Sequence, residues 1–299
     1  MKYFSLFTGV GGLDMGLAEA GHECVGFSEI KESSVEAYSR HYPAHRNFGD
    51  ITKIDFESLP DFDILTGGFP CQAFSLAGLR QGFRDRRGQM IFYIYDLIKI
   101  KRPEFVVLEN VKGLLQHDDG ATYRNVFRML MHAGYHVRVL LLNALNYSSA
   151  QARERLFFLC KRDGDFPLVR PVIIDATKTF RDVRDRNEAH FHFVNITERN
   201  RAKIEQEGSH PFRLIGGYDR VPTLLTSASS CAREQMVTQE EDGRFRYLTE
   251  LEAERLQGFP EGWTEGLSRN NRWFAMGNAV NCDVSRYLFK SYLQEAWWN

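Results

Sequence analysis

The sequence predicts an α/β fold in which a doubly wound, mostly parallel sheet is joined to a smaller, irregular domain. Apolar strand-like runs alternate with amphipathic helical segments over residues 1–165, a pattern typical of parallel sheets covered by helices. A glycine-rich turn, Gly9 to Gly12, links the first strand to the first helix. The alternation stops between about residues 165 and 245, where the chain is polar, so we expect a second domain there.

Each element of the first domain has a local signal. Short apolar runs predict strands at residues 3–7, 23–29, 62–68, 105–110, 136–143 and 156–161. Apolar residues at helical spacing predict helices at residues 13–21, 32–42, 90–102 and 122–134, the first of them closed by Gly21. Near the C-terminus we expect helices at residues 249–259, opened by Thr249, and 279–296.

Composition narrows the class of protein. The 299 residues carry 38 Lys and Arg against 39 Asp and Glu, so global charge argues neither for nor against a nucleic-acid partner. The chain has neither an apolar run of membrane-spanning length nor a signal peptide at its start, and we expect a cytoplasmic protein without a membrane partner. Five scattered cysteines, Cys24, Cys71, Cys160, Cys231 and Cys282, predict reduced thiols. No metal site is expected, since His190 and His192 lack flanking ligands.

The turn "LFTGVGGLDMG" is the first chemical signal. Gly9, Gly11 and Gly12 fall at the carboxyl edge of the expected sheet, where open α/β folds bind ligands and a missing side chain lets a ligand approach the backbone. The dinucleotide fingerprint fails because Asp14 stands in place of its third glycine. The turn therefore favours a nucleotide-like ligand, and a tight strand–helix connection is the alternative.

Two acids and an aromatic residue strengthen the nucleotide interpretation. Glu29 ends the second strand, which is the usual place of an acid that binds ribose hydroxyls. Asp50 follows the next helix and is expected near the adenine end of the ligand, where Phe7 could stack on the base.

Cys71 follows the third strand on a stiff turn. Pro70 fixes its own backbone and favours an extended residue before it, so the loop can hold a thiol at a set position. Glu109 and Asn110 leave the next strand at the same sheet edge. For Cys71 the alternative is a structural cysteine in the core, and for Glu109 it is a solvated loop residue.

Two arginines precede the last strand of the first domain, in "QARERLFFL". Because side chains alternate along a strand, those of Arg153 and Arg155 are expected on the same face, with Gln151 just before them in the sequence. The alternative is a salt-bridged strand entrance.

Several of these segments together resemble the ordered motifs of the cytosine carbon-5 DNA methyltransferases. The resemblance extends from residue 3 to about residue 290. The segments are Gly9-Val10-Gly11-Gly12, Gly67-Gly68-Phe69-Pro70-Cys71-Gln72, Glu109-Asn110-Val111, Gln151 with Arg153 and Arg155, Arg246 with Glu252 and Arg255, and Gly277-Asn278-Ala279-Val280. Several motifs in the right order are far more specific than any single one.

The resemblance implies a DNA (cytosine-5-)-methyltransferase with a Rossmann-like, S-adenosylmethionine-dependent fold. The Cys71 thiolate would add to carbon-6 of a flipped-out cytosine, which makes carbon-5 able to accept the methyl group. Glu109 and Arg155 would stabilise charge at N3 and O2 of the ring, with Arg153 in the same catalytic set. Burial under the base must raise the pKa of Glu109 for it to carry a proton there.

The resemblance also implies the binding residues. S-adenosylmethionine, released as S-adenosylhomocysteine, would contact Phe7, Gly9, Gly11, Gly12, Glu29, Ile30, Asp50, Ile51, Pro70, Asn278 and Ala279. Duplex DNA would contact Ser75, Gln81, Arg84, Arg87, Thr223 and Leu224, with Arg80 and Arg86 as further phosphate ligands in the loop after Cys71. Base contacts are expected between about Arg213 and Arg233.

Residues 1–165 plus 272–299 are expected to form the catalytic and cofactor-binding domain, and residues 166–271 the target-recognition domain, with a DNA-binding cleft between them. We expect a monomer that forms no stable complex with any restriction endonuclease of the same modification system. Two departures from the family pattern affect cofactor contacts: Ile30 replaces a more usual aromatic residue, and Asn281 with Cys282 replaces apolar residues.

Three alternatives remain at this point. A tRNA cytosine carbon-5 methyltransferase shares the catalytic set, but its Cys-Phe-Thr signature is absent. A non-catalytic DNA-binding relative would be expected to lose Cys71 or Glu109, and both are present. A nicotinamide or flavin oxidoreductase would leave the "FPCQ" segment unexplained.

Overall fold

The structure, a computed structural model, describes residues 1–70, 90–164, 172–196, 212–226 and 235–293. The chain divides into two compact units, and each is described by itself. Unit 1 comprises Met1–Leu142, Glu154–Pro171 and Ser285–Asn299, and unit 2 comprises Asn143–Arg153 and Val172–Val284. These units differ in their bounds from the expected functional division at residues 143–153, 166–171 and 272–284, and that division stays a prediction.

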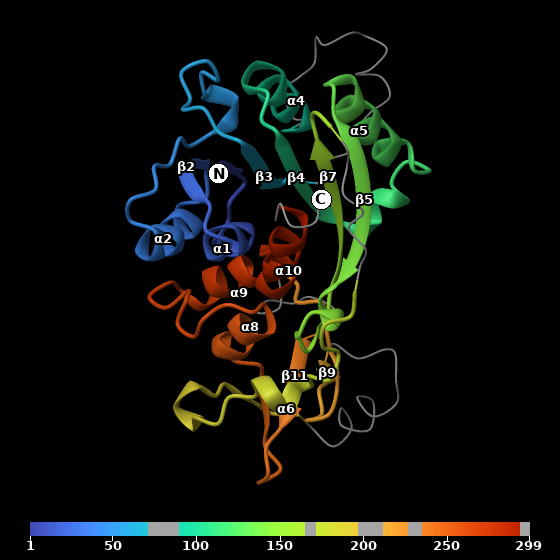
Figure 1. Cartoon of the computed structure of the whole chain (residues 1–299). Helices are drawn as coiled ribbons and strands as arrows, with labels where there is room; N and C mark the ends of the chain where they lie inside the picture. Colours follow the sequence, from blue (N-terminus) through green and yellow to red (C-terminus); the bar gives the residue numbers. More distant parts are fainter. Residues whose placement is uncertain (71–89, 165–171, 197–211, 227–234, 294–299) are drawn as a thin grey trace. The chain divides into compact units, whose positions relative to one another are not determined.

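A six-stranded sheet forms the centre of unit 1, with the strand order β2-β1-β3-β4-β7-β5 (Figure 1). Its strands are β1 Lys2–Leu6, β2 Glu23–Ser28, β3 Ile64–Gly68, β4 Phe105–Val111, β5 His136–Asn143 and β7 Glu154–Lys161. Strand β1 is parallel to β2 and β3, and β3 is parallel to β4. The predicted α/β class is confirmed. Strand β7 runs antiparallel to β4, which strand–helix alternation does not specify.

Helices lie on both faces of this sheet. They are α1 Gly12–Glu19, α2 Glu32–His41, α4 Met90–Lys101, α5 Ala121–His132 and α10 Cys282–Tyr292. Val106 and Leu108 of β4 belong to one apolar core with residues of α4 and α5. The alternate residue Phe105 meets Tyr292 of α10 instead, with ring centroids 5.6 Å apart. This period of two is what a strand buried on both faces produces.

Unit 2 holds a four-stranded sheet, where the sequence led us to expect irregular structure. Its order is β8-β12-β11-β9, with β8 Phe193–Val194, β9 Phe212–Leu214, β11 Gln235–Gln239 and β12 Phe245–Tyr247. The short strands β6 Gln151–Ala152 and β10 Val221–Pro222 pair with each other. The helices that the structure describes in this unit are α6 Phe180–Val183, α8 Glu250–Leu256 and α9 Arg269–Asn278.

Four 3-10 turns complete the described elements: η1 Ile51–Lys53, η2 Lys112–Leu115, η3 Ala144–Asn146 and η4 Glu188–His190. Thr249 caps α8 in a reciprocal capping box with Glu252, as its place in the sequence predicts. Within the described ranges, every helix is too short or too polar to cross a lipid bilayer.

A buried carboxylate lies beneath the glycine turn of unit 1. Asp14 is fully buried in the first turn of α1, and it accepts hydrogen bonds from the Ser5 hydroxyl at 2.9 Å and the Tyr38 hydroxyl at 2.9 Å. The Tyr38 hydroxyl also lies 2.9 Å from Nδ1 of His45. Burial raises the pKa of Asp14 to about 6, although both hydroxyl bonds oppose the rise.

This raised pKa makes the stability of unit 1 depend on pH. The folded protein binds the Asp14 proton more tightly than the unfolded chain does, so the group stabilises the fold at low pH and loses that contribution as the pH rises through about 6. Relative to Asp14→Asn, the wild-type free energy of unfolding should fall by roughly 2 kcal/mol between about pH 4 and pH 7. Urea unfolding at a series of pH values measures this difference.

The exposed carboxylate of Asp55 provides a matched control. Asp55→Asn should follow the wild-type pH dependence. A constant difference between wild type and Asp14→Asn across the range would contradict the prediction.

Candidate functional site

The glycine turn of unit 1 has the backbone that its sequence requires. Gly9 and Gly11 have φ angles of 57° and 92°, in the left-handed region. A Cβ on Gly11 would lie 3.0 Å from the Tyr38 ring, whereas a Cβ on Gly9 would meet nothing within 4 Å. Phe7 also has a positive φ, of 51°, which is uncommon for a bulky residue and typical of functional sites. The turn is thus close-packed at Gly11 and open at Gly9.

Glu29 closes this turn from the end of β2. One carboxylate oxygen, Oε2, accepts the Gly9 N–H at 2.8 Å, and the other accepts the N–H groups of Ile30 at 2.9 Å and Lys31 at 2.8 Å. A carboxylate has about four acceptor positions, so capacity remains for a ligand hydroxyl. The predicted acid and the predicted glycine turn are therefore brought together.

Asp50 lies after β2 in the same unit and caps η1. It accepts the Thr52 N–H at 3.0 Å and the Thr52 hydroxyl at 2.8 Å. These bonds, first of all the backbone one, hold the pKa of Asp50 below its usual value. Ile51 is buried, whereas the side chain of Ile30 is 72 % exposed. Asp50 is thus held ionised next to a buried apolar residue.

Glu109 and Arg155 form an ion pair at the end of β4. The antiparallel pairing of β4 with β7 sets Glu109 opposite Phe157 and Val111 opposite Arg155. Arg155 Nε lies 3.0 Å from Glu109 Oε1, and both side chains are largely buried. Burial lowers the pKa of Arg155, and the Glu109 charge opposes that shift. A carboxyl group and a guanidinium group are thus held together in a partly desolvated place.

Strand β3 approaches this pair closely. A Cβ on Gly68 would lie 2.9 Å from Glu109 Oε2, so a side chain there would displace the carboxylate. The buried Asn110 amide donates to the Phe69 carbonyl at 2.8 Å and fixes the backbone just before Pro70, which is exposed. Cys71 lies outside the described residues, as do Ser75, Arg80, Gln81, Arg84, Arg86 and Arg87.

Arg153 makes a different set of hydrogen bonds in unit 2. Strand β6 ends at Ala152 and β7 begins at Glu154, so the alternation that we expected across the two arginines is interrupted. In unit 2 the buried Arg153 guanidinium donates to the carbonyls of Gly277 at 2.9 Å, Ala279 at 2.8 Å and Leu224 at 3.3 Å. These contacts favour a positioning role for Arg153.

The other predicted residues of unit 2 lie around the same contacts. Gln151 accepts the Leu224 N–H at 3.0 Å, and Leu224 is buried. Thr223 donates its hydroxyl to the Ala152 carbonyl at 2.6 Å. Asn278 is exposed and donates to the Phe274 carbonyl at 3.0 Å, while Ala279 is buried. The cofactor and DNA contacts assigned to these residues stay predictions.

Motif residues of unit 2 also form a buried ionic network. Arg246 and Glu252 are both fully buried and make two hydrogen bonds, of 2.7 and 2.9 Å. Glu252 also accepts the Asp185 N–H at 2.9 Å. Sequence reasoning missed Asp185, because it comes from an irregular segment without a motif of its own.

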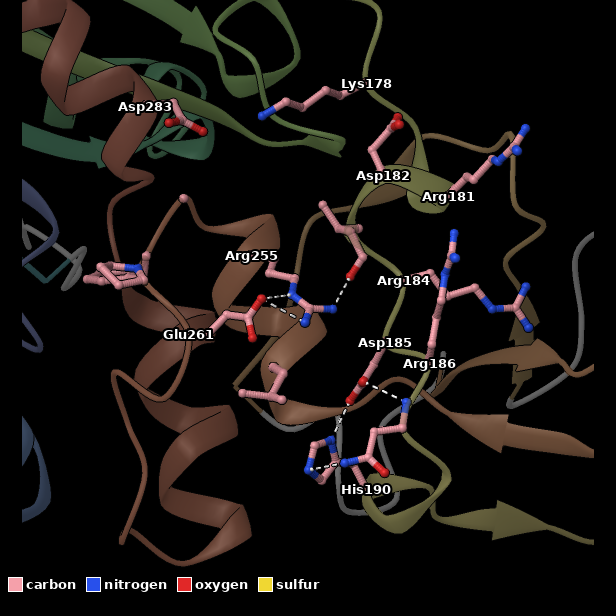
Figure 2. Close-up of a pocket in the computed structure, with 16 residues that line it drawn as sticks. Lys178, Arg181, Asp182, Arg184, Asp185, Arg186, His190, Arg255, Glu261 and Asp283 are labelled. Atoms are coloured by element: carbon pink, nitrogen blue, oxygen red, sulfur yellow. Dashed lines mark hydrogen bonds and ion pairs between the residues drawn. The ribbon is translucent and has the colours of Figure 1, made fainter.

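This network borders a pocket of about 1000 Å³ lined by residues of both charges. Figure 2 shows Arg255 beside Glu261, 2.8 Å apart, and His190 beside Asp185, 2.7 Å apart. Its lining includes none of the predicted catalytic residues, and its central charges are paired with one another. The catalytic roles predicted for Glu109 and Arg155 of unit 1 are thus independent of this pocket and stay predictions.

Comparisons with known proteins identify the family of the chain. Residues 1–294 match the family described as C-5 cytosine-specific DNA methylase. The Type II methyltransferase M.DsaV of Dactylococcopsis salina is 31% identical over 98% of this chain and 86% of its own length. M.NlaX of Neisseria lactamica is 33% identical over 96% of this chain and 94% of its own.

The fold is also similar to solved structures. The S. pombe Dnmt2 methyltransferase superposes with a TM-score of 0.76 at 20% identity, covering 98% of each chain. The Entamoeba histolytica methyltransferase EhMeth gives the same TM-score at 17% identity, over 99% of this chain and 98% of its own. The chain therefore belongs to the C-5 cytosine-specific DNA methylase family and is a DNA (cytosine-5-)-methyltransferase.

Proposed function

We propose that this enzyme transfers the methyl group of S-adenosylmethionine to carbon-5 of a cytosine in duplex DNA, through a transient bond between Cys71 and carbon-6 of a flipped-out base. The observation that carries the proposal is the buried Glu109–Arg155 pair, 3.0 Å apart, next to the strand that leads into Cys71. An acid and a cation held this way suit a pyrimidine ring that gains negative charge during the reaction.

The residues of unit 1 fit an adenosine-type cofactor. Gly9 leaves open space at the turn, and Glu29 keeps acceptor capacity for ribose hydroxyls. Asp50, held ionised, suits an amino group on the base. When bound, S-adenosylmethionine supplies an electrophilic sulfonium methyl group. Phe7, Gly11, Gly12, Ile30, Ile51 and Pro70 complete the contacts that we assign to unit 1, and we further assign cofactor contacts to Asn278 and Ala279 of unit 2.

Residues of the chain would act on the cytosine in a fixed order. The Cys71 thiolate forms a bond to carbon-6, and the displaced ring electrons collect at N3 and O2. Glu109 donates a proton to N3 and Arg155 donates a hydrogen bond to O2. The guanidinium group of Arg155 favours the ionised form of Glu109. The flipped-out cytosine therefore has to exclude water from the Glu109 carboxyl group, so that Glu109 can hold a proton. Once carbon-5 carries the methyl group, a water or hydroxide takes the carbon-5 proton, and the C5=C6 bond re-forms as the carbon-6–sulfur bond breaks and releases the Cys71 thiolate. N3 then returns its proton to the Glu109 carboxylate, which completes the cycle.

The substrate would be extruded from the helix, since carbon-5 and carbon-6 are inaccessible to these groups inside a stacked duplex. Extrusion costs a few kcal/mol, which contacts to the DNA backbone would offset. We assign these contacts to Ser75, Gln81, Arg84 and Arg87, and base recognition to unit 2 around Thr223 and Leu224. Several relatives are named Type II methyltransferases, which supports a role in modification. We assign this role to a monomer in the cytoplasm, as the sequence led us to expect.

The covalent step can be tested by trapping. Duplex DNA that carries 5-fluorocytosine at target sites should become covalently attached to the wild-type enzyme in the presence of S-adenosylmethionine, because fluorine at carbon-5 prevents the elimination that releases Cys71. Cys71→Ser should form no adduct. Gel mobility and peptide mass spectrometry measure the adduct and its site.

Cys24 provides a matched control thiol, because burial raises its pKa to about 12 and keeps it protonated. Cys24→Ser should trap as well as wild type does. An adduct on a residue other than Cys71 would overturn the mechanism. Methyl label that enters tRNA, with none in duplex DNA, would overturn the assigned substrate.

Asn110→Ala should slow the chemical step without weakening cofactor binding. The variant loses the 2.8 Å bond to the Phe69 carbonyl, so the turn before Cys71 is held less firmly, and misplacement by about 1 Å can cost on the order of 10²-fold in rate. Single-turnover methylation measures the rate, and calorimetry measures the dissociation constant for S-adenosylhomocysteine.

The exposed Asn195 of unit 2 serves as the control for this substitution, and Asn195→Ala should keep the wild-type rate. An unchanged single-turnover rate in Asn110→Ala would refute the role given to this amide.

A further inference from the structure

Residues 46–50 run beside the end of β2 and are fixed to it by the backbone. Phe27 and Asn47 form a parallel bridge. The Phe27 N–H donates to the Arg46 carbonyl at 2.9 Å, and the Phe48 N–H donates to the Phe27 carbonyl at 2.7 Å. The Ser28 hydroxyl adds a bond of 2.6 Å to the Gly49 carbonyl. Asn47 is therefore held directly opposite the strand that leads into Glu29.

The amide of Asn47 holds both backbone groups of Glu29. Its Oδ1 accepts the Glu29 N–H at 3.2 Å, and its Nδ2 donates to the Glu29 carbonyl at 3.0 Å. The same Oδ1 accepts the Gly49 N–H at 2.9 Å. Since the peptide groups on both sides of Glu29 are fixed, the direction in which its side chain leaves the backbone is fixed as well.

The two acids assigned to the cofactor are thus joined through one amide. Glu29 reaches from this point to the Gly9 N–H, 2.8 Å from Oε2. Gly49 has a φ of 74° and leads directly into Asp50. Asp50 is held on its other side by its own bonds to Thr52, so loss of Asn47 would release Glu29 more than Asp50.

We propose that Asn47 is a positioning residue of the cofactor site, which aims the Glu29 carboxylate at the ribose hydroxyls of an adenosine ligand. The proposal rests on the proposed function, because it takes Glu29 as the acid that binds ribose. It makes a specific claim: the effect of Asn47 on binding passes through the hydroxyls of the ligand.

The test is a double comparison of protein and ligand. Calorimetry would measure the binding of S-adenosylhomocysteine and of its 2′-deoxy and 3′-deoxy counterparts to wild type and to Asn47→Ala. Wild type should bind the complete ribose most tightly. Asn47→Ala should weaken binding of the complete ribose by about tenfold, because hydrogen bonds that hold Glu29 are lost. One of the two deoxy ligands lacks the hydroxyl that Glu29 binds, and wild type should bind this ligand more weakly than the other. Asn47→Ala should change the dissociation constant of this ligand by less than about threefold, as expected when Asn47 acts through Glu29 and that hydroxyl.

If Asn47 had only a structural role, Asn47→Ala would weaken the binding of all three ligands equally. This result would overturn the proposal. Asn187→Ala is the matched control, since the Asn187 side chain also accepts a backbone N–H, from Ala189 at 3.1 Å, but in unit 2. It should leave all three dissociation constants unchanged. If wild type binds neither S-adenosylmethionine nor S-adenosylhomocysteine, it is the proposed function that fails.

Asn47→Asp keeps the inference testable if Asn47→Ala does not fold. The aspartate can still accept the N–H groups of Glu29 and Gly49, but it places an oxygen against the Glu29 carbonyl. Binding of the complete ribose should weaken in this variant while binding of the deoxy ligands is retained. Equal losses for all three ligands would contradict the proposal here too.

Discussion

The close approach of β3 and β4 at their carboxyl ends is the constraint on which the catalytic proposal depends. A Cβ at position 68 would lie 2.9 Å from Glu109 Oε2, so any side chain there would have to displace that carboxylate. The strand that carries the acid therefore passes directly beside the strand that leads into Cys71. Asn110 strengthens this arrangement through its bond to the Phe69 carbonyl. Strand β7 then adds Arg155 from the far side of β4, and its antiparallel direction decides which of its residues reaches Glu109.

A second constraint operates where β1 and β2 end. The Glu29 carboxylate accepts hydrogen bonds from backbone N–H groups of two segments, the glycine turn and the start of α2. Glu29 therefore stabilises the fold in addition to any ligand that it binds. Asp14 lies under the same turn and is bound by hydroxyl groups of β1 and α2. A buried carboxylate with a pKa of about 6 costs stability at neutral pH. Structural cost of this kind is often found near functional sites, and the positive φ of Phe7 is a further example.

Much of this arrangement could be predicted from the sequence, and what was missed has physical reasons. Alternation and the glycine turn indicated the strands of unit 1 and the residues at their ends, because burial on both faces produces apolar runs. The direction of β7 was not predictable, since alternation says nothing about pairing. Helix α9 is polar in sequence and buries Trp273 and Met276 only through tertiary packing. The sheet of unit 2 has strands of two to five residues, too short for a periodic signal. Asn47 acts through side-chain bonds to the backbone, which leave no pattern in a single sequence.

Arg153 and Arg155, on either side of Glu154, show that two residues of one sequence motif can have different contacts and different roles. They are two positions apart, yet Arg155 holds a carboxylate in unit 1 while Arg153 is surrounded by carbonyl groups in unit 2. A buried guanidinium needs several acceptors to offset its desolvation, and Arg153 obtains them from Leu224 and from both sides of Asn278. If that guanidinium were to turn toward a cytosine, those carbonyls would lose a charged donor. The contacts therefore support Arg155 as the group that touches the base, and Arg153 as the residue that keeps the Thr223–Leu224 and Gly277–Ala279 segments together.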